Sequence, residues 1–427
     1  MGAAGVGHAG GGGLIRAALL LVVVAWAVVG CGERRAADEP LTLWAMGREG
    51  EVVEQMVPAF EARHPGLRVK VQRIPWSAAH EKLLTSFVGG AMPDVVQVGN
   101  TWVPELVVLG APAALDERLA TSSVKRDDWF PGVLDPNVVD GTIWAVPWYV
   151  DTRILFYRSD LIPVAPATWD AWVTALAEAR RHGGPDAHAI LLQLGEWQPL
   201  VIMAMGRGAT LLRQHDCYGD FRNPAFRAAL AFYVELFRSG LAPLGGAASA
   251  ANVYQDFAGG EISAVVTGPW NLGEFAARVP SSVQWSTAPI PASQGAPPGP
   301  SLAGGASLVL VRTSPRADDA WKLIEFLSEP AQQIRLHELT GDLPAHTAAW
   351  NDPKLADDPR VAAFRSQLDA LRATPKIPEW ERIAGKITQF AEAAIRGTMS
   401  VDDATTALDA AADGILEKRR WLLGGCG

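Results

Sequence analysis

The chain has 427 residues, of which 49% are hydrophobic and 19% are charged, and its formal net charge is -9. This is the composition of a globular protein with enough material for two domains. The acidic balance, with charges of both signs scattered along the chain, argues against a nucleic-acid partner. Sixteen tryptophans against five tyrosines suggest that some indoles line a site for flat ligands, although core packing is the simpler explanation for any single one.

The N-terminus carries the pattern of an export signal. Arg16 is followed by thirteen apolar residues (17–29), a length typical of a signal-peptide core and too short to span a bilayer comfortably. The run ends in "VVGC", which resembles the bacterial lipobox. That resemblance implies a signal peptide over 1–30, a lipid on Cys31, and a tether over 31–40, with ~0.8 kcal/mol of membrane affinity for each buried CH₂. The alternative is a plain secretory signal with an incidental cysteine.

Residues 41–99 alternate between strand and helix patterns. We predict strands over 41–46, 67–74 and 93–99, and helices over 47–66 and 77–90. This rhythm is typical of a largely parallel α/β sheet, in which ligands bind beyond the carboxyl ends of the strands. The loops "AMGREG" and "GNTW", which follow the first and third strands, are therefore candidate ligand loops.

The middle of the chain is more helical. Helices are predicted over 168–184, with Thr168 as N-cap, and over 224–240; a turn, a strand and a helix follow over 257–279. The strand and helix style of the first third returns near 305–346, and 352–421 is almost entirely helical. Because the alternation of strands and helices stops after the first third and resumes near 305, we expect two lobes, each built from separate segments of the chain.

The stretch "GTIWAVPWYVDTRILFYRSD" (141–160) has strand composition, yet Pro147 lies near its middle. We interpret it as two strands, one in each lobe, joined where the chain crosses between them. Pro147 is expected to mark the end of the first ladder. Trp148 and Tyr149 alternate sides if extended, and Tyr149 is favoured to face the ligand.

Cys217 and Cys426 remain once Cys31 is assigned to the lipid. An exported protein meets conditions in which disulfides form, but the sequence does not show that these two cysteines approach each other, so the pairing stays open. Neither they nor the eight histidines show metal-ligand spacing, and no cofactor motif is present.

Five segments in order carry a resemblance to a known family: "FEARHPGLRVKV", "GGAMPDVVQVGNTW", "GTIWAVPWYVDTRILFYRSDLI", "FAGGEISAVVTGPW" and "GGASLVLVRTSPRADDAWKLIEFLSEP". The body resembles the carbohydrate-binding extracytoplasmic solute-binding proteins of ABC importers, of the maltodextrin and trehalose type. The resemblance implies two α/β lobes, each with a mixed, mainly parallel sheet, and a ligand cleft between them. Lobe 1 would comprise 41–149 and 304–349, and lobe 2 would comprise 150–303 and 350–427.

The same resemblance implies a monomeric, lipid-anchored binding protein outside the cytoplasm that passes a sugar to permease subunits, without catalysis. Carried over position by position, it places thirteen residues near the cleft: Arg48, Glu49, Asn100, Thr101, Trp102, Tyr149, Asp151, Glu196, Trp197, Trp270, Gly304, Gly305 and Arg382. Trp270, in "TGPW", matches the family's stacking tryptophan. At Gly304 and Gly305 the missing side chain would let sugar approach the backbone.

The chemistry of these residues fits the carry-over. Aromatic rings suit the apolar faces of pyranoses, and carboxylates accept hydrogen bonds from the hydroxyls of the rim. Two other functions stay open. A glycoside-acting enzyme would use a carboxylate pair, such as Asp151 and Glu196. A receptor for another polar solute, such as glycerol 3-phosphate or a glycerophosphodiester, would use positive charge, for which Arg48 and Arg382 are the candidates.

Overall fold

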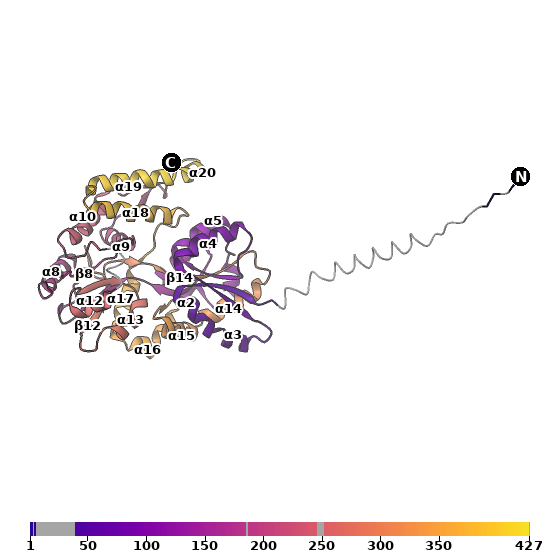
Figure 1. Ribbon diagram of the computed structural model, residues 1–427, viewed down its shortest axis with the longest axis horizontal. Coiled ribbons are helices and arrows are strands. Elements are labelled where there is room, and N and C mark those ends of the chain that lie inside the picture. Colours follow the sequence, from indigo (N-terminus) through magenta and orange to yellow (C-terminus); the bar gives the residue numbers. More distant parts are fainter. Residues whose placement is uncertain (3, 6–38, 185–186, 246–251, 427) are drawn as a thin grey trace.

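A computed structural model describes residues 1–2, 4–5, 39–184, 187–245 and 252–426. Cys31 and the apolar run before it lie outside the described residues, so the predicted lipid site is not described. Within the described part of the chain, no helix is both long enough and apolar enough to cross a membrane. Figure 1 shows two lobes side by side, one built mainly from the first third of the chain and one mainly from its middle.

The sheet of the first lobe has six strands. In spatial order they are β15 (Leu343–Pro344), β6 (Val146–Asp151), β14 (Gly304–Leu310), β3 (Val95–Gly99), β1 (Leu41–Met46) and β2 (Val69–Ile74). β1 pairs in parallel with β2 and β3, as predicted, whereas the pairings of β14 with β3 and of β6 with β14 and β15 are antiparallel. The expectation of a mainly parallel sheet is therefore wrong beyond β3, because β6 leaves the lobe and β14 re-enters it in the opposite direction.

Side chains of β1 alternate between two apolar layers, as a strand buried on both faces requires. Leu41, Leu43 and Ala45 pack in one core with helices on one face, and Trp44 and Met46 pack in another core on the opposite face. The helices of this lobe are α2 (Gly47–Val52), α3 (Val57–Arg63), α4 (Trp76–Val88), α5 (Val103–Leu109), α6 (Asp116–Thr121), α7 (Pro131–Leu134), α14 (Ala317–Ser328) and α15 (Pro330–Thr340).

The predicted helix over 47–66 is divided. Between α2 and α3 the chain forms a 3₁₀ turn, Val53–Gln55, and Pro58 occupies the first turn of α3. Proline has no amide hydrogen and is tolerated in a first turn but not in a helix interior, which explains why a new helix begins there. The helix predicted over 77–90 is observed as α4, which ends at Gly89.

The second lobe has a four-stranded sheet. Its strands in spatial order are β12 (Trp285–Ala288), β7 (Ile154–Arg158), β11 (Ala264–Thr267) and β8 (Ile190–Leu191). β7 is antiparallel to both β11 and β12, and only β8 runs parallel to β11, so this sheet too is mixed rather than mainly parallel. Its helices are α8 (Trp169–Arg180), α9 (Gln198–Gly206), α10 (Pro224–Arg238), α12 (Val253–Gly259) and α13 (Trp270–Arg278). The amide of Ala171 donates to Thr168 Oγ1 at 3.3 Å, which confirms the predicted N-cap of α8.

The C-terminal segment returns to the second lobe. It forms α16 (Pro353–Ala356), α17 (Pro359–Gln367), α18 (Trp380–Ile395), α19 (Val401–Ile415) and α20 (Glu417–Leu422). Phe364 of α17 packs edge-on against Phe156 of β7 at 6.1 Å between ring centres. Two-stranded pairs complete the structure: β4 (Val138–Val139) with β5 (Thr142–Ile143), β9 (Leu212–Arg213) with β10 (Tyr218–Gly219), and β13 (Ser301–Leu302) with β16 (Leu371–Arg372).

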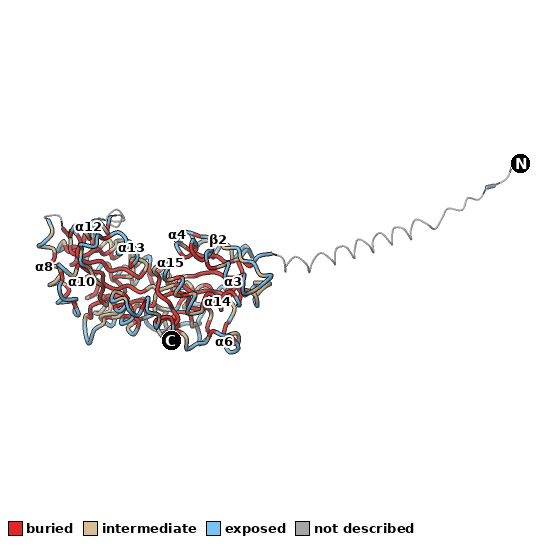
Figure 2. Tube along the Cα trace, turned by 90° about the horizontal axis from the view of Figure 1, so that it is seen from below, coloured by how far each residue is buried: buried red, intermediate tan, exposed pale blue. Residues whose placement is uncertain are grey.

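Besides the short β5, the stretch 141–160 forms two strands in different sheets, as predicted: β6 ends at Asp151 and β7 begins at Ile154. Pro147, however, does not end a ladder. It lies inside β6, opposite Ser307, where the register with β14 shifts. On its other side β15 pairs only with Tyr149 and Val150, so Pro147 faces no partner strand there. A bulge and a free edge both accept a residue without an amide hydrogen. Figure 2 shows that the strands crossing between the lobes are buried.

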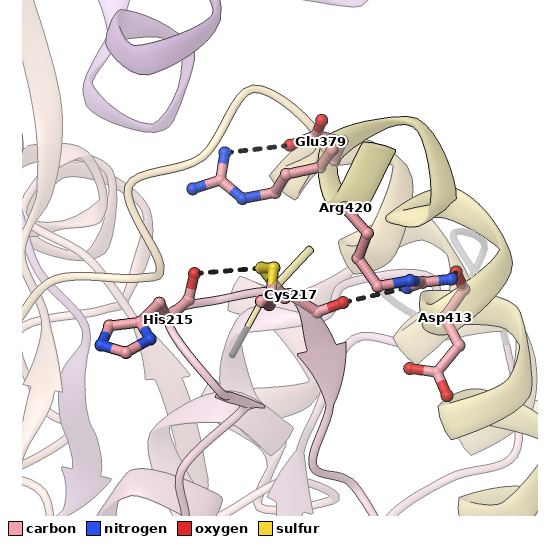
Figure 3. Close-up of a disulfide and its surroundings, with 7 residues drawn as sticks. His215, Cys217, Glu379, Asp413 and Arg420 are labelled. Carbon is pink, nitrogen blue, oxygen red and sulfur yellow. Dashed lines mark hydrogen bonds and ion pairs between the residues drawn. A yellow bond between two sulfur atoms is a disulfide. The ribbon is translucent and has the colours of Figure 1, made fainter. Parts of the chain in front are cut away.

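Cys217 and Cys426 form a disulfide with their Cα atoms 6.3 Å apart, which settles the pairing that the sequence left open. The bond ties the end of the chain to the loop before β10 (Figure 3). Arg420 reinforces the attachment, because its guanidinium donates to the carbonyl oxygens of Cys217 and Asp413 at 3.0 and 2.8 Å.

Candidate functional site

Three side chains of the first lobe form a hydrogen-bonded group beneath the crossing strand β6. Gln97, fully buried in β3, donates from Nε2 to the Tyr149 hydroxyl at 3.0 Å and to Glu49 Oε2 at 3.4 Å. Its Oε1 accepts from the amide of Met46 at 2.7 Å. A glutamine inside a buried strand therefore fixes two of the predicted site residues, Glu49 and Tyr149. Trp148 points the other way and is fully buried in the core.

Two further acids lie close to Glu49. Burial and the nearby Glu49 carboxylate raise the pKa of Asp342 well above its usual value. The pKa of Asp151 rises to about 6, chiefly because of burial, with the charge of Arg153 opposing the rise and those of Glu196 and Glu49 adding to it. Asp151 Oδ1 and Asp342 Oδ2 are buried and have no hydrogen-bond partner among the described residues. They are the polar atoms here with capacity for a further hydrogen bond.

Arg153 links the crossing strand to the second lobe. Its Nη2 contacts Glu196 Oε2 at 2.8 Å, and its Cζ lies 5.4 Å from the centre of the Trp270 ring. Trp270 is the first residue of α13. Its indole lies back over Gly268, where a Cβ would meet the ring at 1.8 Å. Glu196 and Trp270, which were predicted from different segments, are thus brought together by an arginine that was not predicted.

A second group lies around the 3₁₀ turn that follows β3, Asn100–Trp102. The Trp102 ring packs edge-on against Trp76 at 5.5 Å and lies 5.1 Å from the His80 ring. Thr101 donates to Glu381 of α18, a bond that joins the first lobe to the C-terminal helices. Burial raises the pKa of Glu381, and the hydrogen bond that His80 donates to the Glu105 carboxylate raises the pKa of His80.

Arg48 and Trp270 line one groove of about 530 Å³ between α2, α13 and α15. Arg48 is exposed; it donates weakly to the Leu339 carbonyl at 3.4 Å and lies 3.7 Å from Glu51. Gly341 also lines the groove, and a Cβ there would lie 3.3 Å from the carbonyl oxygen of Pro269. Segments of both lobes therefore approach closely at this edge.

The remaining predicted residues have structural contacts of their own. Asn100 donates to the Ala303 carbonyl at 3.4 Å and accepts from the Ser307 hydroxyl at 2.8 Å, which ties it to the β14 crossing. Trp197 packs edge-on against the buried Trp380 at 5.3 Å. Arg382 is exposed on α18, and its neighbour Glu381 makes the contact with the first lobe.

The two glycines of the second crossing are explained by the neighbouring strand. A Cβ at Gly304 would lie 2.1 Å from the carbonyl oxygen of Asp151, and one at Gly305 would lie 2.3 Å from that of Tyr149. Gly305 also has a φ of +130°, which side chains disfavour. The approach of β6 therefore requires glycine at both positions, whether or not a ligand lies nearby.

Four residues of the site were missed by sequence reasoning: Gln97, Arg153, Asp342 and Glu381. The sequence could have indicated two of them, because Gln97 is a polar residue within an apolar strand and Arg153 is a charged residue within the predicted crossing. Asp342 and Glu381 join the site only through tertiary folding. The described residues contain no group of three or more histidine, cysteine or acidic residues placed to hold a metal ion.

Proteins of known family and structure share this architecture. A family model described as bacterial extracellular solute-binding protein matches residues 46–334. The sugar-binding protein MalE of Xanthomonas citri superimposes with a TM-score of 0.86 at 44% identity, over 90% of this chain and 99% of that one. The diacetylchitobiose binding protein DasA of Streptomyces coelicolor is 24% identical over 87% of this chain and 90% of that protein.

A third similar protein is UgpB of Mycobacterium tuberculosis, whose structure is described in complex with glycerophosphocholine. It shares the fold with a TM-score of 0.77 at 22% identity, over 89% of this chain and 99% of that one. The two-lobed fold expected from the sequence is thereby confirmed. The matching proteins are binding proteins rather than enzymes, in agreement with the expectation of no catalysis.

Proposed function

Because the chain belongs to the bacterial extracellular solute-binding protein family, we propose that it captures a sugar, of di- or oligosaccharide size, between its lobes and delivers it to the permease of an ABC importer. The name of the 44% identical MalE, a sugar-binding protein, supports the choice of sugar. The binding protein acts as a monomer and releases its ligand chemically unchanged.

The observation that carries this proposal is the pairing of one aromatic ring with two buried acids, each of which has one oxygen without a hydrogen-bond partner among the described residues. Trp270 supplies an apolar face, and the Asp151 and Asp342 oxygens without partners supply hydrogen-bond capacity within the same group of residues. A pyranose has apolar C–H faces and a rim of hydroxyls, so it complements both features. Buried polar groups without partners are costly, and a ligand hydroxyl would satisfy them.

Lobe closure is part of the proposal. We place the division between the lobes at the crossings, with 41–149 and 304–349 in lobe 1 and 150–303 and 350–427 in lobe 2. The change of sheet between Asp151 and Ile154 supports this division. Hinge rotation at such crossings is a known route to closure around a ligand.

A phosphorylated solute is the weaker candidate. Among the described residues, the charges that act on Asp151 are those of one cation, Arg153, and two acids, Glu49 and Glu196, so a phosphate would meet a net negative charge there. Arg48 and Arg382, the positive charges considered from the sequence, are both exposed. At 22% identity, the similarity to UgpB supports a shared fold but not a shared ligand.

Isothermal titration calorimetry tests the proposal directly. The mature protein is titrated with a panel of di- and oligosaccharides and with glycerophosphocholine, and each mixture is then examined chromatographically for products. We expect saturable binding of a sugar, with micromolar affinity equivalent to about -8 kcal/mol, and no turnover. Binding of glycerophosphocholine alone would favour the second candidate, and released monosaccharide would disprove the non-enzymatic function.

A further inference from the structure

We propose that Arg153 is a positioning residue of the binding site: from the first crossing it holds the Trp270 indole for stacking and supplies the positive charge that faces Asp151. One guanidinium would then organise both the apolar and the polar parts of the site. This inference rests on the proposed function, because it assigns Trp270 and Asp151 to the ligand.

The backbone of Arg153 is fixed by both crossings. The residue lies between the last residue of β6 and the first of β7 and is 9% exposed. The Ser301 hydroxyl, from the second crossing, donates to its carbonyl oxygen at 2.8 Å. Gly304 pairs with Asp151 in the neighbouring ladder. Contacts with both crossing segments therefore fix the backbone position from which the Arg153 side chain extends.

The guanidinium has two partners in the second lobe. Glu196 accepts from Nη2 at 2.8 Å, and the Trp270 ring centre lies 5.4 Å from Cζ. A planar guanidinium stacks on an aromatic face and keeps its donors free for a carboxylate, which a lysine ammonium does not reproduce. Arg153 and Gly268 both pack against the indole, and the part of the ring that stays exposed is the part we assign to the ligand.

The charge of Arg153 acts on Asp151, whose surroundings are otherwise acidic or neutral. Glu49 of α2 and Glu196, just before α9, raise the pKa of Asp151, and Arg153 lowers it. Asp342, beside β15, is a further acid that interacts with Asp151. Tyr149 is a further titratable group beside Asp151; burial raises its pKa well above the usual value, so it stays neutral between pH 5 and pH 8.

Three variants separate these roles. Arg153→Met removes the charge and the planar group, and Arg153→Lys keeps the charge alone. Arg158→Met is the matched control, since Arg158 is similarly buried at 8% exposure and is paired with Asp160 at 2.7 Å, but it lies at the other end of β7 from Arg153. Sugar affinity is measured by calorimetry for each variant between pH 5 and pH 8.

We expect affinity of the native protein to fall as the pH drops through about 6, where Asp151 gains its proton. In Arg153→Met the midpoint of this fall should move to higher pH, and affinity at pH 8 should be about three- to tenfold weaker. Arg153→Lys should keep the native midpoint while losing affinity. Arg158→Met should keep both midpoint and affinity.

A ligand-free measurement separates failure of this inference from failure of the proposed function. The carboxyl of Asp151 is titrated by ¹³C NMR, and Trp270 is followed by ¹⁹F NMR in protein labelled with 5-fluorotryptophan, with Trp270→Phe to assign the signal. Arg153→Met should raise the Asp151 midpoint and shift the Trp270 signal. If both observables stay native, the inference is wrong, even if sugar binds. If they change but no sugar binds, the proposed function is wrong and the positioning role stands.

Discussion

Trp270 is the single side chain on which the stacking part of the site depends. It starts α13, lines the groove between the lobes, and has Arg153 on one ring face. Replacing it with alanine should reduce sugar affinity by more than about 1 kcal/mol, the loss typical of a buried aromatic anchor. Calorimetry on folded protein measures this. Trp421→Ala is the control, because that indole is 78% exposed on α20 and should not matter. Native affinity in Trp270→Ala would remove Trp270 from the site.

Asp342 should leave a signature in the pH dependence of stability. Its pKa is raised in the folded protein, so the folded state binds its proton more tightly than the unfolded state. Stability from this group is therefore fully present below the unfolded pKa near 3.8 and is lost as the pH rises toward the folded value. The difference in unfolding free energy between the native protein and Asp342→Asn should accordingly fall as the pH rises from 4.

Urea unfolding at several pH values between 4 and 8 measures that difference. Asp160→Asn is the matched control, because the hydrogen bond from Arg158 lowers the pKa of Asp160. Its contribution to stability is fully present above the unfolded pKa near 3.8, so the difference for Asp160→Asn should stay constant between pH 4 and pH 8. A flat difference for Asp342→Asn across this range would show that the acid is not held in a buried, acidic environment.

At the scale of elements, the C-terminal helix α20 is held by a covalent bond rather than by burial. None of its residues is buried, and Trp421 and Leu422 are largely exposed. The disulfide joins residues 209 positions apart, so it restricts a long loop in the unfolded chain. Cys217→Ser should therefore lower the unfolding free energy, by about 2–4 kcal/mol.

Scanning calorimetry with and without a reducing agent checks this. Reductant should lower the melting temperature of the native protein toward that of Cys217→Ser and should leave the variant unchanged. Equal melting temperatures for both proteins without reductant would show that the bond adds nothing to stability. Sugar affinity serves as an internal control, since the bond lies outside the groups assigned to the ligand.

At the scale of the whole molecule, the two lobes are not independent units. One apolar core contains residues from both sheets, among them Leu43 of β1 and Phe156 of β7, and runs beneath the crossings. In the closure that we propose, the lobes rotate around this shared core, on the side where Trp270, Gly341 and the acids lie. The crossings, which also hold Arg153 and Asp151, would then couple ligand contact to movement.

The location of the molecule is also a testable proposal. We propose that it is anchored by a lipid on Cys31, on the extracytoplasmic side of a membrane, because "VVGC" closes the apolar run. Cys31→Ser in the full chain should move the protein from the membrane fraction to the soluble fraction, which fractionation and immunoblotting measure. Wild-type labelling with a palmitate analogue is the companion assay. Retention of the variant in membranes would indicate an uncleaved anchor instead.

The sequence by itself determined the two-lobed α/β architecture and supplied candidate residues for the site. Strand and helix periodicity located β1, β2, β3, α4 and α8, since both periods are local properties of the chain. The ordered family segments identified Glu49, Tyr149, Asp151, Glu196 and Trp270 as candidates. Only the tertiary structure decided which of them meet, because Arg153, Gln97 and Asp342 connect them across segments far apart in sequence. Strand direction beyond β3, the place of Pro147 at a bulge and the Cys217–Cys426 bond depended likewise on long-range pairing, which no local pattern records.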